Sequence, residues 1–233
     1  MNETVASMVT KGNRAADVGC DHGFVPIFLV ESGISPLAVA ADVRPGPLSR
    51  AKEHIKEYRL EEKIQTRLSD GLANIKPGEA DSLIMSGIGG ILMMRLLQDE
   101  EHTAKSFKEL ILSPQSELFD VRRYLVSNGY LIEYEHMLCD EGKYYFIFHV
   151  LVKKDEREWL EEEYRYGKDI CKDDMKTFLA YLEKEERQYE QILEKMKQAP
   201  ENDRAAQRIA QLHQDITCLK KRRQLVYDCG CFA

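Results

Sequence analysis

The sequence lacks any long hydrophobic run. No apolar segment in its 233 residues approaches the roughly 20 residues that a helix needs to cross a bilayer. The N-terminus also lacks a charged segment followed by an apolar core, which is the pattern of a secretory signal. We therefore expect no membrane partner and a cytoplasmic location.

Cysteine is scattered rather than paired. Of the six cysteines, only Cys229 and Cys231 lie close together, in a C-x-C sequence near the end of the chain. No second pair and no cluster of histidines completes the ligand set of a zinc site. The sequence therefore predicts no metal site and reduced thiols, as is usual in a cytoplasm.

A surplus of positive charge is missing as well. The chain has 33 Lys and Arg against 40 Asp and Glu, which gives a net charge of −7. This balance argues mildly against nucleic acid as a partner, because domains that bind phosphate are usually basic, although a local patch can act on an acidic chain. Candidate patches lie at residues 122–123, 153–154 and 220–223, where the alternative is a solvated helix face or strand end.

Short apolar segments alternate with helical patterns over the first 152 residues. Strands are predicted at residues 14–18, 37–42, 64–69, 81–86 and 110–114. Turn residues follow each of them, which indicates a parallel sheet with helices on both faces. Residues 130–138 and 144–152 are joined by a tight polar turn and predict an antiparallel hairpin. A mostly parallel, seven-stranded Rossmann-like sheet that closes with such a hairpin is typical of class I methyltransferases.

The composition changes at Asp155 to Glu, Lys, Gln and Tyr, and no strand is predicted beyond it. We expect a domain boundary here, with residues 1–154 forming the ligand-binding domain and residues 155–233 forming a helical domain. A first helix is predicted to run from the boundary to about Tyr166. The Asp173-Asp174 pair then indicates the N-cap of a new helix.

Two apolar series at helical spacing follow in the helical domain. The first consists of Met175, Phe178, Leu182, Tyr189, Ile192 and Met196. The second consists of Ala205, Ile209, Leu212, Ile216, Leu219 and Val226. A turn at Ala199-Pro200 separates them, so the pattern predicts an antiparallel coiled-coil hairpin, with a plain packed helical hairpin as the alternative.

The most informative segment runs from Asp17 to Gly23, where the first predicted strand ends and an apolar helix begins. Gly19 allows the backbone to approach a ligand, and the free N–H groups of the helix N-terminus point towards it. A strand that ends in Asp-x-Gly before a helix is how an open α/β sheet builds a nucleotide site.

Acidic residues or glycines also follow the next three strands, and ligands bind at these ends in open α/β sheets. Asp42 ends the second strand, where an acid can bind ribose hydroxyls. Asp70 ends the third, where a carboxylate can accept the amine of adenine. Alone, each acid could be a helix cap or a turn residue. The predicted cofactor ligands are Asp17, Gly19, Cys20, Asp21, Asp42, Val43, Asp70, Gly71, Ser86 and Gly87.

The ligand could be a dinucleotide or S-adenosylmethionine. Dinucleotide sites use the pattern G-x-G-x-x-G, with the pyrophosphate at the helix N-terminus. Here Asp21 occupies the place of the second glycine. A carboxylate there repels a pyrophosphate but suits a sulfonium ligand that carries an ammonium group. The sequence therefore favours S-adenosylmethionine as the cofactor.

Six short motifs follow the predicted strands and helices of the first domain. They begin at Asp17, Asp42, Ser69, Ser86, Leu112 and Ser127 and read DVGCDHGF, DVRPGPL, SDGL, SGIGG, LSPQ and SNGY. Together they resemble the bacterial tRNA (adenine(22)-N1)-methyltransferases, the TrmK family. The resemblance covers essentially the whole chain, since this family also carries a C-terminal coiled-coil domain.

This resemblance implies methyl transfer from S-adenosylmethionine to N1 of an adenine in tRNA by a protein that we expect to be monomeric. Asp21 is the predicted catalytic carboxylate, and His22 is expected to orient it or to contact the base. The predicted substrate-binding residues are Gly89, Gly90, Lys220, Lys221, Arg222 and Arg223. The alternatives are a class I methyltransferase with another substrate and an inactive methyltransferase-like binding module.

The chain departs from the usual motifs of this family at three places. Gly23-Phe24 stands where the family usually has Ala-Tyr, so that a tyrosine hydroxyl is missing. Ser86 and Ile88 stand where it usually has Ala and Met. Residues 4–9 look like the end of the family's first helix, so the chain is expected to start late. We expect these departures to affect substrate specificity more than cofactor identity.

Overall fold

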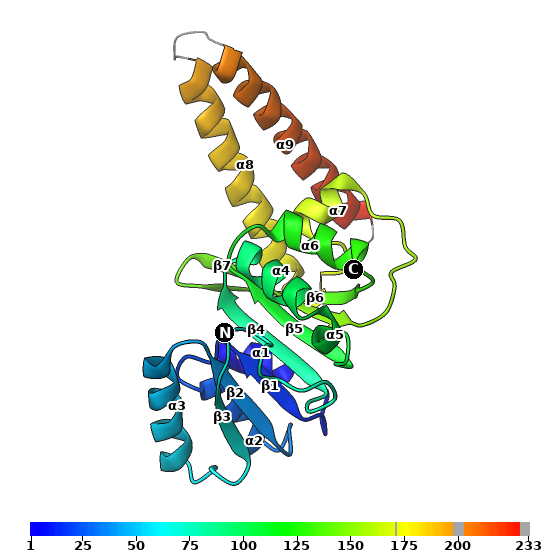
Figure 1. Ribbon diagram of the computed structural model, residues 1–233. Coiled ribbons are helices and arrows are strands. Elements are labelled where there is room, and N and C mark those ends of the chain that lie inside the picture. Colours follow the sequence, from blue (N-terminus) through cyan, green and yellow to red (C-terminus); the bar gives the residue numbers. More distant parts are fainter. Residues whose placement is uncertain (171, 198–202, 229–233) are drawn as a thin grey trace.

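The computed structural model describes residues 1–170, 172–197 and 203–228, and a seven-stranded sheet forms its centre (Figure 1). The strands are β1 (Ala15–Val18), β2 (Ala38–Asp42), β3 (Ile64–Leu68), β4 (Ser82–Ile88), β5 (Glu109–Pro114), β6 (Leu131–Asp140) and β7 (Lys143–Leu151). Their order is β3-β2-β1-β4-β5-β7-β6. The strands from β3 to β5 are parallel, whereas β7 is antiparallel to β5 and β6. The predicted Rossmann-like sheet with a closing hairpin is confirmed.

Helices cover both faces of the sheet. One face packs against α1 (Asn2–Ser7), α2 (Phe24–Glu31) and α3 (Pro45–Glu57), and the other against α4 (Gly90–Asp99), α5 (Glu101–Ala104) and α6 (Leu118–Ser127). Successive strand residues point to opposite faces, so that Ala15 belongs to the first core and Ala16 to the second. Because both faces are covered, the central strands are mostly apolar, with their few polar residues towards the strand ends.

The order of the strands reverses at β1. β2 and β3 lie on one side of it, and β4 and β5 lie on the other. The helices that follow β1 and β4 therefore cover opposite faces and leave a crevice at the carboxyl ends of these two strands. The loops that carry the predicted site residues all reach this edge.

Beyond β7, the described chain contains α7 (Glu161–Tyr166), a 3-10 turn (Lys172–Asp174), α8 (Met175–Lys197) and α9 (Asp203–Asp228). α8 and α9 lie side by side and antiparallel, and they extend away from the sheet as a hairpin (Figure 1). The turn predicted at Ala199-Pro200 lies outside the described residues. The domain boundary at residue 154 and a coiled-coil geometry remain predictions. None of the described helices combines the length and the apolarity that crossing a membrane requires.

Two details predicted for the helical region are wrong. The first helix begins only at Glu161, because the Asp155 carboxylate accepts hydrogen bonds from the backbone and guanidinium of Arg157 and from the indole of Trp159. Such local side-chain bonds compete with helix formation. In α8, Ile192 is 40% exposed, and its neighbour Leu193 is buried in its place.

A buried ion pair joins α6 to the sheet and to α7. Arg122 and Glu135 are both fully buried, and Nη2 of Arg122 lies 2.7 Å from Oε2 of Glu135. Arg122 also donates to the backbone carbonyls of Tyr164 and Arg165 at the end of α7. Arg122 therefore belongs neither to a surface patch nor to a solvated helix face, whereas its neighbour Arg123 is exposed.

A second buried guanidinium holds α9 to the same region. Arg222 is 6% exposed and donates to the carbonyls of Gly167 and Lys168, which follow α7. The prediction that Arg222 contacts tRNA phosphates is therefore wrong, because its guanidinium is buried and already bound to the backbone. Arg122 and Arg222 therefore tie the sheet and α9 to the segment around α7, while apolar residues of α8 and α9 pack into the same core as the sheet.

Candidate functional site

The loop between β1 and α2 is built from residues with left-handed backbone angles. Gly19 has φ +83°, Asp21 has φ +44° and Gly23 has φ +73°. Glycine adopts this region freely, and aspartate tolerates it better than most residues. The N–H groups of Gly19 and Cys20 both donate to the carbonyl of Ala41, which fixes the loop against the end of β2.

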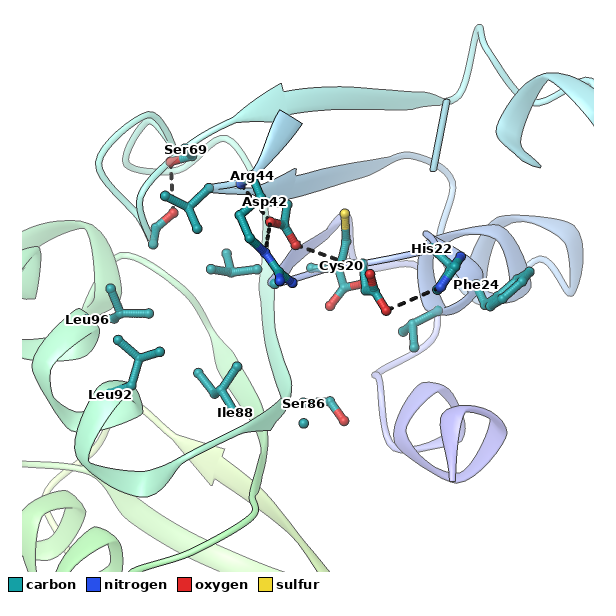
Figure 2. Close-up of a pocket in the computed structure, with 18 of the residues that line it drawn as sticks. Cys20, His22, Phe24, Asp42, Arg44, Ser69, Ser86, Ile88, Leu92 and Leu96 are labelled. Atoms are coloured by element: carbon teal, nitrogen blue, oxygen red, sulfur yellow. Dashed lines mark hydrogen bonds and ion pairs between the residues drawn. The ribbon is translucent and has the colours of Figure 1, made fainter. Parts of the chain in front are cut away.

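A cavity of about 510 Å³ opens beside this loop, at the carboxyl ends of the parallel strands (Figure 2). Its walls include all ten residues predicted as cofactor ligands, namely Asp17, Gly19, Cys20, Asp21, Asp42, Val43, Asp70, Gly71, Ser86 and Gly87. The sheet thus brings together residues from four separate loops. That these residues bind the cofactor remains a prediction.

Asp17 is the most unusual group in the cavity wall. It is 4% exposed, and its carboxyl has no hydrogen bond or ion pair with any residue in the described ranges. Burial, together with the nearby charge of Asp42, raises the pKa of Asp17 to about 7. A cationic group of a ligand would relieve this cost. Burial also raises the pKa of the Cys20 thiol, which therefore stays protonated and is no nucleophile.

Asp42 connects the first two loops of the cavity. Its Oδ1 accepts a hydrogen bond of 2.8 Å from the N–H of Arg44, and its Oδ2 accepts one of 3.3 Å from the N–H of Asp21. A carboxylate has about four acceptor positions, so both oxygens retain lone pairs for a ligand's hydroxyl groups. Asp42 therefore shapes the site and can still bind within it.

The two predicted catalytic side chains lie together at the rim of the cavity. His22 Nε2 is 3.5 Å from Oδ2 of Asp21, and Nη2 of Arg50 is 3.1 Å from its Oδ1. The Asp21 side chain is 52% exposed, in contrast to the buried Asp17. A carboxylate in this position can act on charge that develops at the mouth of the cavity rather than at its base.

Three aromatic rings stack beside Asp21. The three rings contact one another: the Phe24 ring is 4.8 Å from that of His54, and the His22 ring is 5.7 Å from each of the other two. His54 Nδ1 donates to the carbonyl of His22 at 2.9 Å, which holds the stack to the loop. Phe24 remains 45% exposed and lines the cavity, as Figure 2 shows. The stack provides a flat aromatic surface at the cavity mouth.

The opposite wall comes from β4 and α4. The hydroxyl of Ser86 is buried and has no hydrogen-bond partner within the described chain. Gly87 follows with φ +79°, and Ile88, Leu92 and Leu96 give this wall an apolar surface (Figure 2). Buried hydroxyls are normally paired, so the Ser86 hydroxyl is a second indication that this wall binds a ligand.

Several residues of the wall had no predicted role, among them Arg44, Leu92, Leu96 and Gln115. Gln115 follows the carboxyl end of β5, so the rule that identified the loops after β1 to β4 would also have found it. Leu92 and Leu96 carry no such signal, because an apolar residue at helical spacing indicates core packing.

Gly89 and Gly90 do not line the cavity. A Cβ atom on Gly90 would lie 2.4 Å from the carbonyl oxygen of Ser116 and 2.8 Å from a methyl group of Val121. The N–H of Gly90 donates to the Ser116 hydroxyl at 3.3 Å. Gly90 therefore serves the close packing of α4 against the loop after β5, and the contact of Gly89 and Gly90 with substrate remains a prediction.

The basic cluster of α9 is largely engaged within the protein. Lys220 Nζ and Arg223 Nη1 lie 3.6 Å and 2.5 Å from the carboxylate of Glu186 in α8. Arg222 is buried, as described above, and Lys221 is exposed. Of the four predicted phosphate contacts, Lys221 is thus the best placed to reach an RNA backbone.

The described ranges contain no group of three or more His, Cys, Asp or Glu residues arranged to hold a metal ion. Cys229 and Cys231 lie outside these ranges, so the structure describes neither of them.

Comparison with known proteins identifies relatives of the whole chain. Residues 2–148 match the family described as "Methyltransferase domain". The chain is 27% identical over 225 residues to the tRNA (adenine(22)-N(1))-methyltransferase of Bacillus subtilis, with 94% of each chain covered. The crystal structure of the B. subtilis M1A22 tRNA methyltransferase TrmK is 26% identical, with a TM-score of 0.83 and coverage of 94% of this chain and 96% of that chain.

Sp1610 of Streptococcus pneumoniae is similar to the same extent. Its crystal structure is 31% identical, with a TM-score of 0.84 and coverage of 94% of this chain and 96% of that chain. A second structure of Sp1610, in complex with S-adenosyl-L-methionine, has a TM-score of 0.82. These matches include both the sheet domain and the helical hairpin. The chain therefore belongs to the methyltransferase domain family and, within it, to the bacterial tRNA (adenine(22)-N1)-methyltransferases.

Proposed function

We propose that the protein transfers a methyl group from S-adenosylmethionine to N1 of adenine 22 in tRNA. The observation that carries the proposal is the buried carboxyl of Asp17, which lines the cavity without a partner among the described residues. The name of the B. subtilis relative supports the nucleotide, and the S. pneumoniae complex with S-adenosyl-L-methionine supports the cofactor.

The residues of the cavity fit this cofactor. Asp17 suits its ammonium group, Asp42 its ribose hydroxyls and Asp70 the amine of its adenine. Leu92 and Leu96 offer apolar surface to a flat ring. When bound, S-adenosylmethionine supplies an electrophilic methyl group on its sulfonium.

The chain does not need a general base for this reaction. N1 of adenine carries a lone pair at neutral pH, so catalysis rests on positioning and electrostatics. The adenine gains positive charge as the bond forms, and the Asp21 carboxylate stabilises that charge more in the transition state than in the ground state. Arg50 and His22 hold Asp21 at the rim of the cavity.

The target base has to leave its stack to reach the cavity. The exposed ring of Phe24, supported by the ring of His54, provides a surface on which such a base can stack. Since Phe24 lacks a hydroxyl, this contact consists of stacking without a hydrogen bond. His22 lies beside it and is available to contact the base edge.

The test is incubation of the protein with methyl-labelled S-adenosylmethionine and tRNA transcripts. We expect label to be incorporated into a transcript with adenosine at position 22 and not into a matched transcript with guanosine there. Asp21→Asn is expected to lower turnover more than cofactor affinity.

Two outcomes contradict the proposal. Cofactor binding without transfer to any RNA favours a class I methyltransferase with another substrate. Failure to bind the cofactor favours an inactive binding module that acts through its helical hairpin.

We also propose that the enzyme is a monomer in the cytoplasm, where mature and precursor tRNA are present. Light scattering after size-exclusion chromatography is expected to give the mass of one chain. A mass of two chains at micromolar concentration contradicts the monomer.

A further inference from the structure

A second cavity, of about 220 Å³, lies where the loop after β5 meets α7 and α8. The lining residues used below are Glu117, Phe119, Tyr166, Tyr181, Glu185 and Tyr189. Ser116, which also lines it, directly follows Gln115, which lines the cofactor cavity. The two cavities therefore share one short loop, and a ligand in the second lies near the reacting centre.

A carboxylate and two tyrosine side chains lie together in this second cavity. The side chains of Tyr166 and Tyr189 line the cavity together with the carboxylate of Glu185. Burial raises the pKa of Glu185, and no residue in the described ranges forms an ion pair with it. Since a carboxylate has about four acceptor positions, Glu185 retains lone pairs for a ligand's donors.

The charges around this cavity disfavour a phosphate. Glu117 and Glu185 both belong to its wall. Arg165, a cation of the same wall, is already neutralised because it lies 3.0 Å from Glu161 and 3.0 Å from Asp215. An anion would meet two carboxylates there, whereas a neutral group with N–H donors would find an acceptor.

Aromatic rings make up much of the remaining wall, at Phe119, Tyr166, Tyr181 and Tyr189. Such rings bind the faces of unstacked bases in single-stranded RNA. The exposed Arg123 lies with its guanidinium carbon 5.6 Å from the centre of the Phe119 ring and has no ion pair within the described chain. It is placed to contact the phosphate attached to a base that enters the cavity.

We propose that this cavity binds a second, unstacked nucleobase of the tRNA, with its N–H groups on Glu185 and its face against the tyrosine rings. Guanine fits best, because its N1 and N2 present adjacent donors to one carboxylate. The inference rests on the proposed function, since it adds a specificity site for the same RNA. The short loop between the cavities places this base close in space to the methylated adenine.

The test is tRNA binding in the absence of cofactor, measured for the wild type and for Glu185→Gln. Each is titrated with transcripts in which one nucleotide at a time near position 22 lacks its base. Glu183→Gln is the matched control, because Glu183 is an exposed carboxylate of the same helix. We expect the wild type to lose about tenfold in affinity at one position. Compared with the wild type, Glu185→Gln is expected to bind the intact tRNA about fivefold more weakly. Removal of the base at that one position should then weaken its binding little further.

The inference is overturned if removal of a base lowers the affinity of the wild type and of Glu185→Gln equally at every position. It is also overturned if Glu185→Gln and Glu183→Gln bind intact tRNA with equal affinity. Tyr189→Ala removes one of the rings against which the base is proposed to stack and is expected to give the same non-additive pattern. The labelling assay with adenosine or guanosine at position 22 separates the two claims. Methylation of adenine 22 without coupling at Glu185 leaves the proposed function intact and removes the second site.

Discussion

The cofactor cavity and the junction between sheet and hairpin, by which we mean the contacts of Arg122 and Arg222 described above, both contain buried polar groups. The two regions differ in how these groups are paired. In the cavity, the Asp17 carboxyl and the Ser86 hydroxyl have no hydrogen-bond partner among the described residues. In the junction, Arg122 and Glu135 bind each other, and Arg122 also binds backbone carbonyls. An unpaired buried polar group costs free energy. The difference therefore distinguishes a site that a ligand completes from a network that serves the fold.

The largest expected effect comes from breaking the junction. Arg122→Ala leaves the Glu135 carboxylate buried without its counter-charge. We expect the free energy of unfolding, measured by urea denaturation, to fall by about 3–5 kcal/mol. Arg123→Ala, at the adjacent exposed position, is the control and should change it by less than about 0.5 kcal/mol. Similar losses for both variants contradict the structural role of Arg122.

Asp17→Asn should raise, rather than lower, the free energy of unfolding of the ligand-free protein. The pKa of Asp17 is about 7 when folded and 3.8 as a free carboxyl, so the folded state retains a proton that the unfolded state releases. Wild-type stability therefore falls as the pH rises from about 4 to 7. The variant avoids this loss and should be more stable by on the order of 2–4 kcal/mol above pH 7, with no gain near pH 4. Thermal denaturation across this range measures it, and a pH-independent difference contradicts it.

The smallest effect compares two serines of β4. The Ser82 hydroxyl donates to Glu109 at 2.6 Å and accepts from Asn13 at 3.0 Å, whereas the Ser86 hydroxyl is unpaired within the described chain. Ser82→Ala should lower the free energy of unfolding by about 1–2 kcal/mol, and Ser86→Ala by less than about 0.5 kcal/mol without ligand. Equal losses in urea denaturation would mean that Ser86 has a partner inside the protein.

The cavity could be predicted from the sequence because of a property of parallel sheets. The carboxyl ends of their strands meet at one edge, so residues as far apart as Asp17, Asp42 and Ser86 were expected to share a site. Each of them lies at or after the carboxyl end of a strand, and this position alone predicts a place at the shared edge. The same reasoning did not find Leu92 and Leu96, because their apolar side chains carry no signal that separates a cavity wall from a core.

The junction could not be predicted, because its contacts come from segments that are remote in the sequence. In the sequence, Arg122 next to Arg123 indicates a basic surface patch. In the structure, a carboxylate of β6 and two carbonyls of α7 bind Arg122 in the interior. Arg222 likewise belongs to a basic cluster in the sequence, but in the structure it donates to the carbonyl of Gly167. Gly90 resembles a ligand loop in sequence, yet it is needed because Ser116 packs against it.

The most direct test of the account is the number of protons released when S-adenosylmethionine binds. Calorimetry at pH 6 in two buffers of different ionisation enthalpy measures it. Because the pKa of Asp17 is about 7 in the free protein, this carboxyl is mostly protonated at pH 6 and must ionise to pair with the ammonium group. We predict release of roughly one proton by the wild type and none by Asp17→Asn, which should also bind more weakly. Binding by the wild type without proton release would contradict the role of Asp17 as the unpaired buried acid that the cofactor completes.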